Sequence, residues 1–232
     1  MSAMRTLATV VRALGLARAA LAVLASLSAG GCALTSKADI VEIRHFSPER
    51  VRPRLTSTDA AGAARAPSPP APNGAFDLRL GRVTSGPNLR ERIAFRDAAY
   101  ELGYYEELRW TERPETFVRR ELGRALFEEH GLHRVVGGDV PTLEVEVIAF
   151  DDLRLPSGRA ARVQLKVILF EGSGGVLYEE TVTVDRPAIS PRPKIEDVVA
   201  AMAEALDAAA DQVTVKVQAA LVARRERAPA DR

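Results

Sequence analysis

The 232-residue chain has the composition of a folded protein, with 47% hydrophobic and 27% charged residues. Its 32 basic and 31 acidic residues nearly balance, so it lacks the basic excess typical of nucleic-acid-binding proteins. A single cysteine excludes an internal disulfide and a cysteine-based zinc site.

Residues 1–31 have the pattern of a secretory signal peptide. Arg5, Arg12 and Arg18 come first, and an apolar run over 19–29 follows, shorter than the roughly 20 residues that a membrane-spanning helix needs. A buried Ala/Leu helix of the folded protein is the alternative interpretation. The segment contains three of the 32 basic residues and none of the 31 acidic ones, so its removal leaves 29 bases against 31 acids.

The only cysteine, Cys32, directly follows this segment. The small residues Ala29, Gly30 and Gly31 before it resemble the lipobox of bacterial lipoproteins, in which leucine is more usual at the position of Ala29. In such signals the cysteine becomes the N-terminus and carries acyl chains such as palmitate, and two or more chains anchor a protein stably. We predict that Cys32 is lipidated; a plain signal-peptidase site is the alternative. By resemblance to sorted lipoproteins, Ala33 points to the outer membrane.

The lipid-anchored segment 32–75 is predicted to contain a strand and a linker. The strand-like residues Ile40–Phe46 predict a first strand at about 39–46, which we expect to join the main sheet. Residues 58–74 are rich in Ala, Pro and Ser, which predicts an extended or disordered linker. We favour a long surface loop between two strands over a tether that extends the protein's reach.

An α+β domain is predicted over 76–223, and it begins with strands. Alternation of apolar and polar residues from Phe76 predicts a half-buried strand, and short strands are expected at 93–96 and 102–105. A helix follows from Pro114 to His130. Thr111 is its candidate N-cap, and Gly131 is its expected stop.

The second half of the domain is predicted to be a three-stranded antiparallel meander followed by a helix. Strands are expected around 143–147, 163–169 and 176–185, the last two joined by the glycine-rich turn 172–175. Apolar residues then recur at three- and four-residue steps from Lys194 to Arg224, which predicts a helix even though its part 213–217 is β-branched. The tail 224–232 is expected to be disordered. The fold class is α+β, with a single mostly antiparallel sheet and two main helices packed on it.

Two stretches of the domain resemble the ABC-type transport auxiliary lipoprotein family. They are residues 76–96, FDLRLGRVTSGPNLRERIAFR, and residues 100–128, YELGYYEELRWTERPETFVRRELGRALFE. In that family a turn like Pro87-x-Leu89 leads to a short strand, and an Arg-Trp pair, here Arg109 and Trp110, enters the helix. The resemblance covers roughly residues 39–222; the long linker and the polar residues 84–86 depart from the family pattern.

Histidine and aspartate side chains are the candidates for metal binding or catalysis in this sequence. His45, His130 and His133 are the only imidazoles, and we expect them at the surface or at a helix end, not at a metal site. Asp151-Asp152 has the composition of an acid/base pair or a cation site, but we expect a solvated corner at a strand end. No glycine-rich phosphate loop or nucleophile elbow follows a strand. We therefore predict no catalytic, metal or cofactor-binding residue, and no enzyme.

Four aromatic side chains form a second cluster of interest: Tyr100, Tyr104, Tyr105 and Trp110. We favour core filling with the hydroxyls at the edge of the core. The alternative is a contact patch for a partner protein or an acyl chain, formed by Tyr104, Tyr105 and Trp110. Arg109 is expected to pair with one nearby glutamate, among Glu106, Glu107 and Glu112.

The family resemblance implies an accessory lipoprotein of an MCE-type ABC transport system. Such a protein is anchored in the outer membrane, faces the periplasm, docks onto an MCE-domain protein and helps to move phospholipids or other apolar molecules. A separate ATPase would hydrolyse ATP, because this chain has no nucleotide motif. A homo-oligomeric ring is an expectation by family analogy. The alternative is an envelope-assembly or scaffold lipoprotein that binds proteins without handling lipid.

Overall fold

The computed structural model describes residues 41–49, 76–98, 100–156, 158–172 and 174–227. The chain divides into two units, 1–42 and 43–232, and every element below belongs to the second unit. The predicted signal peptide, Cys32 and the linker 58–74 lie outside the described residues.

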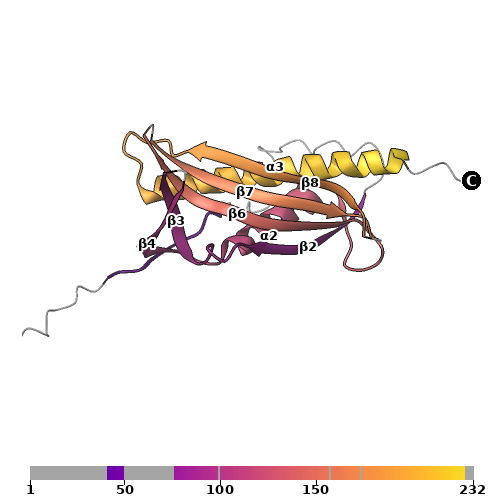
Figure 1. The fold of residues 1–232 in the computed structure, drawn as a ribbon, viewed down its shortest axis with the longest axis horizontal. Coiled ribbons are helices and arrows are strands. Elements are labelled where there is room, and N and C mark those ends of the chain that lie inside the picture. The colour runs from indigo at the N-terminus through magenta and orange to yellow at the C-terminus, as the bar shows by residue number, and fades with distance from the viewer. Residues whose placement is uncertain (1–40, 50–75, 99, 157, 173, 228–232) are drawn as a thin grey trace, which may run out of the picture. The chain divides into compact units, whose positions relative to one another are not determined.

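Eight strands of the described chain form one mixed sheet (Figure 1). They are β1 Arg44–Phe46, β2 Asp77–Ser85, β3 Arg92–Ala98, β4 Glu101–Trp110, β5 His133–Arg134, β6 Thr142–Leu155, β7 Gly158–Phe170 and β8 Val176–Pro187. The antiparallel pairings are β3–β4, β6–β7 and β7–β8, and these contain most of the paired residues. The pairings β1–β4, β2–β5, β2–β6 and β3–β6 are parallel.

The central strand β6 is long enough to border two strands along one edge. Its first half, from Thr142 to Val147, pairs with β2, and its second half, from Asp151 to Leu153, pairs with β3. The other edge of β6 pairs with β7 along nearly its whole length. The predicted meander is therefore confirmed, and β2 and β3 extend it through parallel pairing.

The strand predicted at 102–105 is longer in the structure and runs to Trp110. Its last residues are bordered on both sides, because Arg109 pairs with β3 and Trp110 pairs with Phe46 of β1. The Arg109-Trp110 pair thus ends a strand and does not enter the helix. The segment before the linker joins the main sheet through β1, as predicted, but the strand is shorter than the predicted 39–46, since residues 41–43 are not in a strand.

Three helical elements follow the sequence pattern closely: α2 Pro114–Gly123, the π-helix η1 Arg124–Glu129 and α3 Ile195–Arg227. The N-cap of α2 is Arg113, without a side-chain cap bond, so Thr111 does not cap this helix. Gly131 has a φ of 66°, as expected for the residue that stops the helix. Residues 213–217, four of which are β-branched, are helical, and α3 continues four residues into the segment predicted as a disordered tail.

The core lies between the sheet and the helices. α3 packs on β7 and β8, α2 packs on β2 and β6, and the two helices contact each other (Figure 1). Alternate residues of β6 and β7 are fully buried toward the helices, as are Met202, Ala209 and Val213 of α3. These contacts confirm an α+β fold with both main helices on the sheet. Among the described helices, none is long and apolar enough to cross a membrane.

Candidate functional site

The two adjacent aspartates of β6 lie inside the sheet and not at a solvated corner. Asp151 and Asp152 are both 0% exposed. The prediction of a corner is wrong because β6 does not end there: it continues to Leu155 between β3 and β7. Adjacent residues of a strand point to opposite faces, so each carboxylate has its own surroundings.

Each buried carboxylate accepts charge-assisted hydrogen bonds from side chains of other strands. Arg96 Nε of β3 donates to Asp151 Oδ2 over 2.6 Å. Asp152 Oδ2 accepts from Tyr105 Oη over 2.6 Å and from Arg159 Nη2 over 2.5 Å. Arg159 Nη2 also donates to Tyr105 Oη over 2.7 Å, which closes a triangle between β4, β6 and β7.

Aromatic and cation–π contacts surround the Tyr105 side chain next to these hydrogen bonds. The rings of Phe95 and Tyr105 meet edge to face with centroids 5.1 Å apart. The Arg154 guanidinium lies 3.6 Å from the Phe95 centroid and 4.9 Å from that of Tyr105. Burial raises the pKa of the Tyr105 hydroxyl, and its hydrogen bond to Asp152 raises that pKa further. These contacts hold the β3–β4 hairpin against β6 and β7.

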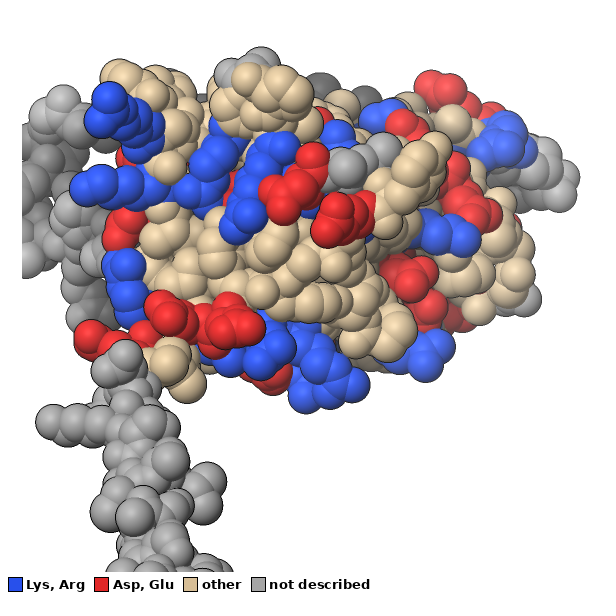
Figure 2. Space-filling model, turned by 60° about the vertical axis from the view of Figure 1, so that its left-hand side comes forward, with Lys and Arg blue, Asp and Glu red and all other residues tan. Residues whose placement is uncertain are grey.

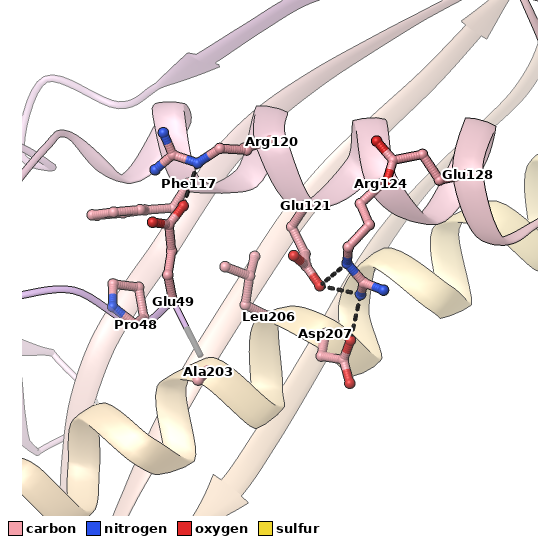
Figure 3. Close-up of a pocket in the computed structure, with 10 residues that line it drawn as sticks. All are labelled: Pro48, Glu49, Phe117, Arg120, Glu121, Arg124, Glu128, Ala203, Leu206 and Asp207. Carbon is pink, nitrogen blue, oxygen red and sulfur yellow. Dashed lines mark hydrogen bonds and ion pairs between the residues drawn. The ribbon is translucent and has the colours of Figure 1, made fainter. Parts of the chain in front are cut away.

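A groove of about 440 Å³ lies between α2, η1 and α3 (Figure 3). Its lining combines apolar side chains with charged ones: Pro48, Glu49, Phe117, Arg120, Glu121, Arg124, Glu128, Ala203, Leu206 and Asp207. The segment after β1 contributes Pro48 and Glu49, so residues far apart in the sequence form one surface. The groove is amphiphilic and belongs to the unit 43–232.

The two arginines of the groove are paired with acids from other elements. Arg120 of α2 pairs with Glu49, and Arg124 extends toward α3, where Nη2 lies 2.5 Å from Asp207 Oδ1 (Figure 3). Arg124 also donates to Glu121, and this hydrogen bond raises the pKa of Arg124 above its usual value. The Arg120–Glu49 pair joins α2 to the segment after β1, and the Arg124–Asp207 pair joins η1 to α3. The groove suits non-covalent binding to a surface of mixed charge.

A second hollow of about 470 Å³ lies near the C-terminal end of α3. Phe76, Leu177 and Leu221 supply apolar surface there, beside arginines of the last helical turns. The guanidinium of Arg225 lies 4.4 Å from the Phe76 ring centroid, and Arg224 Nε donates to Glu171 over 2.7 Å.

The histidines lie apart from one another. His133 Nδ1 is 2.6 Å from Asp77 Oδ1, and His130 Nε2 is 3.7 Å from Asp211 Oδ1. His45 lies on β1 and is exposed. Within the described ranges, no group of three or more His, Cys, Asp or Glu residues is placed to hold a metal ion.

The predicted aromatic contact residues lie at different depths. Trp110 is 2% exposed and packs edge to face on Phe117 and Phe150. Tyr104 is partly buried, and its hydroxyl donates to the carbonyl oxygen of Asn88 over 2.9 Å. A contact of Tyr104 and Tyr105 with a partner or a lipid stays a prediction.

Arg109 uses backbone acceptors in place of the predicted glutamate partner. Its Nη1 donates to the carbonyl oxygens of Tyr105 and Leu108 over 3.1 and 3.0 Å. The three arginines around the buried aspartates, Arg96, Arg154 and Arg159, were not singled out from the sequence. The stretch DDLRLPSGRAAR indicates such pairs, because its acids and bases flank a Pro-Ser-Gly turn and therefore lie across from each other in a hairpin.

Comparisons with known proteins agree with the fold. The family model described as ABC-type transport auxiliary lipoprotein component matches residues 57–214. The structure of protein XCC0632 from Xanthomonas campestris is similar, with a TM-score of 0.61 and 21% identity over 69% of this chain and 94% of that one. The structure of an uncharacterized protein has a TM-score of 0.54 and 14% identity, covering 61% and 92%. These two likenesses show the fold alone. No curated protein matches the sequence.

Proposed function

Because the chain belongs to the ABC-type transport auxiliary lipoprotein component family, we propose that it is a non-enzymatic accessory of an MCE-type transport system in the bacterial envelope. Acyl chains on Cys32 anchor it in the outer membrane, and the folded unit faces the periplasm. There it docks onto an MCE-domain protein and helps phospholipids or other apolar molecules to pass. A separate permease and ATPase supply the membrane channel and the energy.

The observation that carries this proposal is the extent of the family match. Residues 57–214 include every strand from β2 to β8, both α2 and η1, and most of α3. The match therefore covers most of the folded unit and not a short motif within it. The lipobox-like residues before Cys32 support the anchor independently, since they lie outside the matched range.

The two hollows of the folded unit support a role in non-covalent docking. Both combine apolar side chains with arginine and acidic groups. Interfaces between proteins have this mixture of an apolar centre and a polar rim. The buried aspartates take part in cross-strand hydrogen bonds, and we assign them a structural role.

Crosslinked purification of the full-length, tagged protein from its native envelope tests the proposal. We expect the MCE-domain protein to be recovered in the crosslinked complex, together with phospholipid above the level carried by an unrelated outer-membrane lipoprotein. The unrelated lipoprotein is the matched control for membrane fragments.

Recovery of envelope scaffold proteins alone, without lipid enrichment, would contradict the transport role and favour the scaffold alternative. Recovery of the MCE-domain protein without lipid would support the docking function and contradict direct lipid handling. Mass spectrometry of the crosslinked peptides would also show which surface of the unit is in contact.

A further inference from the structure

Three chain connections lie side by side at one end of the sheet. They are the β3–β4 turn, the β6–β7 turn and the loop from β8 to α3. Strand β3 is parallel to β6, and β6, β7 and β8 alternate in direction. The C-terminal ends of β3, β6 and β8 therefore lie at the same end of the sheet. Neighbouring strands are about 4.8 Å apart, so the three connections together span roughly 15 Å.

Each connection exposes a large apolar side chain to solvent. Tyr100 in the β3–β4 turn is fully exposed, Leu155 at the end of β6 is 49% exposed, and Ile189 in the β8–α3 loop is 88% exposed. Single exposed apolar side chains are ordinary on protein surfaces. Three on adjacent connections form a group, and grouped exposed apolar residues mark interaction sites.

The β8–α3 loop adds positive charge to this group. Residues 186–194 contain Arg186, Arg192 and Lys194 and no acidic residue. Two flanking acids are paired outside the loop, since Asp185 binds Arg162 and Glu196 binds Arg44, and Asp197 accepts a hydrogen bond from the Lys194 amide. Figure 2, in which the left-hand end of Figure 1 is turned forward, shows basic and acidic side chains around a continuous uncharged surface.

The loop is held in place and is not free to fold its apolar residue inward. Prolines at 187, 191 and 193 restrict its backbone. The Ala188 amide donates to the Arg159 carbonyl over 2.9 Å, and Arg159 Nη1 donates to the Pro193 carbonyl over 3.1 Å. The exposure of Ile189 is therefore a property of the folded loop.

The start of the folded unit contacts the helix that follows the basic loop. β1 pairs with Leu108–Trp110, the last residues of β4, so the contact of this segment with the end of the sheet is made by a side chain. Arg44 Nη2 lies 2.5 Å from Glu196 Oε1, in the first turn of α3 just after the basic loop. Cys32 precedes Ile43 by a chain length that spans at most about 40 Å when fully extended. A membrane anchor at Cys32 is thus within reach of this end.

We infer that the surface formed by Tyr100, Leu155 and Ile189, with Arg186, Arg192 and Lys194, contacts the membrane that holds the anchor. We call it the tip surface. The apolar side chains enter the interfacial region of the lipid, and the bases lie at anionic headgroups. The contact fixes the orientation of the folded unit on the bilayer. This inference rests on the lipid anchor of the proposed function.

A fluorescent probe at position 189 tests the inference in the full-length protein. Because Cys32 is the only cysteine, Ile189→Cys provides a single free thiol in an acylated chain. The purified protein is labelled with an environment-sensitive thiol dye and placed in vesicles of phosphatidylethanolamine and phosphatidylglycerol. We expect a blue-shifted emission that lipids with spin-labelled acyl chains quench.

Two further variants sharpen the test. Val136→Cys is the matched control, because Val136 is 89% exposed and follows β5, which pairs with the start of β2 at the opposite end of the sheet. Its dye should stay in water. Adding Arg192→Glu and Lys194→Glu to Ile189→Cys should reduce the lipid-inserted fraction about tenfold, since each base near an anionic surface contributes favourably.

The outcomes separate the anchor from the tip surface. A dye at 189 that stays in water on anchored protein would overturn the inference and leave the anchor intact. A shift that appears only after the MCE-domain protein is added would also overturn it and identify a protein interface. Labelling of the wild-type chain would show that Cys32 is not acylated. The membrane contact is then measured by vesicle co-sedimentation of Cys32→Ser with and without Arg192→Glu and Lys194→Glu, and equal binding of the two overturns it.

Discussion

Asp152 carries a buried charge that is neutralised by an arginine and hydrogen-bonded by a tyrosine from two other strands. Tyr105 of β4 and Arg159 of β7 both bind its Oδ2, within 2.6 Å and 2.5 Å respectively. The carboxylate is 0% exposed, so water does not replace a lost partner. Its effect on stability therefore differs from that of an exposed ion pair.

Replacing Asp152 by alanine should lower the free energy of unfolding by about 1–3 kcal/mol, because the partly buried Arg159 and Tyr105 lose their hydrogen-bond acceptor. Asp185→Ala is the control, since Asp185 pairs with Arg162 on the solvent side with both side chains more than a third exposed. That change should cost about 0–1 kcal/mol. Urea unfolding followed by circular dichroism measures both. Equal losses would contradict the structural role of the buried pair.

The Tyr105 hydroxyl makes the free energy of unfolding fall as the pH rises in the alkaline range. Its pKa is raised in the folded state, first by burial and then by the bond to Asp152. The unfolded chain therefore loses this proton first as the pH rises above about 10, and stability falls until the folded-state pKa is passed.

We expect the wild-type unfolding free energy to fall more steeply above about pH 10 than that of Tyr105→Phe. The fully exposed Tyr100 supplies the control variant, Tyr100→Phe, which should retain the wild-type slope. Tyr178 adds to the slope in every variant, because burial raises its pKa too. Parallel slopes for wild type and Tyr105→Phe would contradict the prediction.

At the scale of elements, one glycine in strand β4 has no room for a side chain, and one glycine in helix α2 has room for it. Gly103 of β4 pairs with Phe95 of β3, and a Cβ atom there would overlap the Phe95 ring. That ring is also held by Tyr105 and Arg154. Gly123 ends α2 with helical φ and ψ, and a Cβ atom there meets nothing within 4 Å.

Gly103→Ala should therefore destabilise the fold by about 1–3 kcal/mol, since the ring of Phe95 has to move. Gly123→Ala should stabilise it by about 0.5–1 kcal/mol, because alanine restricts the unfolded chain and favours the helix. Thermal unfolding of the two variants gives the comparison. A stabilising Gly103→Ala would show that Phe95 moves without cost.

Element boundaries were predicted best where local chemistry sets them. Gly131 ends its helix because a positive φ suits glycine, and Pro114 begins one because its fixed φ suits the first turn. The end of β4 was predicted too early. Its last residues form a strand because β1, more than fifty residues away in sequence, pairs with them.

At the scale of the whole molecule, the proposed membrane attachment depends on one residue outside the folded unit. Cys32→Ser removes the proposed acylation site and none of the contacts of the unit 43–232. We expect the variant to leave the membrane fraction for the soluble periplasmic fraction, with an unchanged circular dichroism spectrum.

Cell fractionation with metabolic labelling by a palmitate analogue measures both parts. The wild-type chain should carry the label and Cys32→Ser should not. A variant that stays membrane-bound and unlabelled would contradict the acyl anchor. Ala33→Ser, next to the cysteine but without its thiol, is the control and should stay labelled and membrane-bound.

The sequence by itself determined the α+β class, the order of strands and helices, and the family. Hydrophobic periodicity and turn residues are local, so they can be recognised without a structure. The buried Asp151 and Asp152, the parallel pairings of β6 and the tip surface depend on which strands become neighbours. Only the tertiary structure decided these, because pairing joins residues far apart in sequence and so sets which charges are buried and which apolar side chains stay in water.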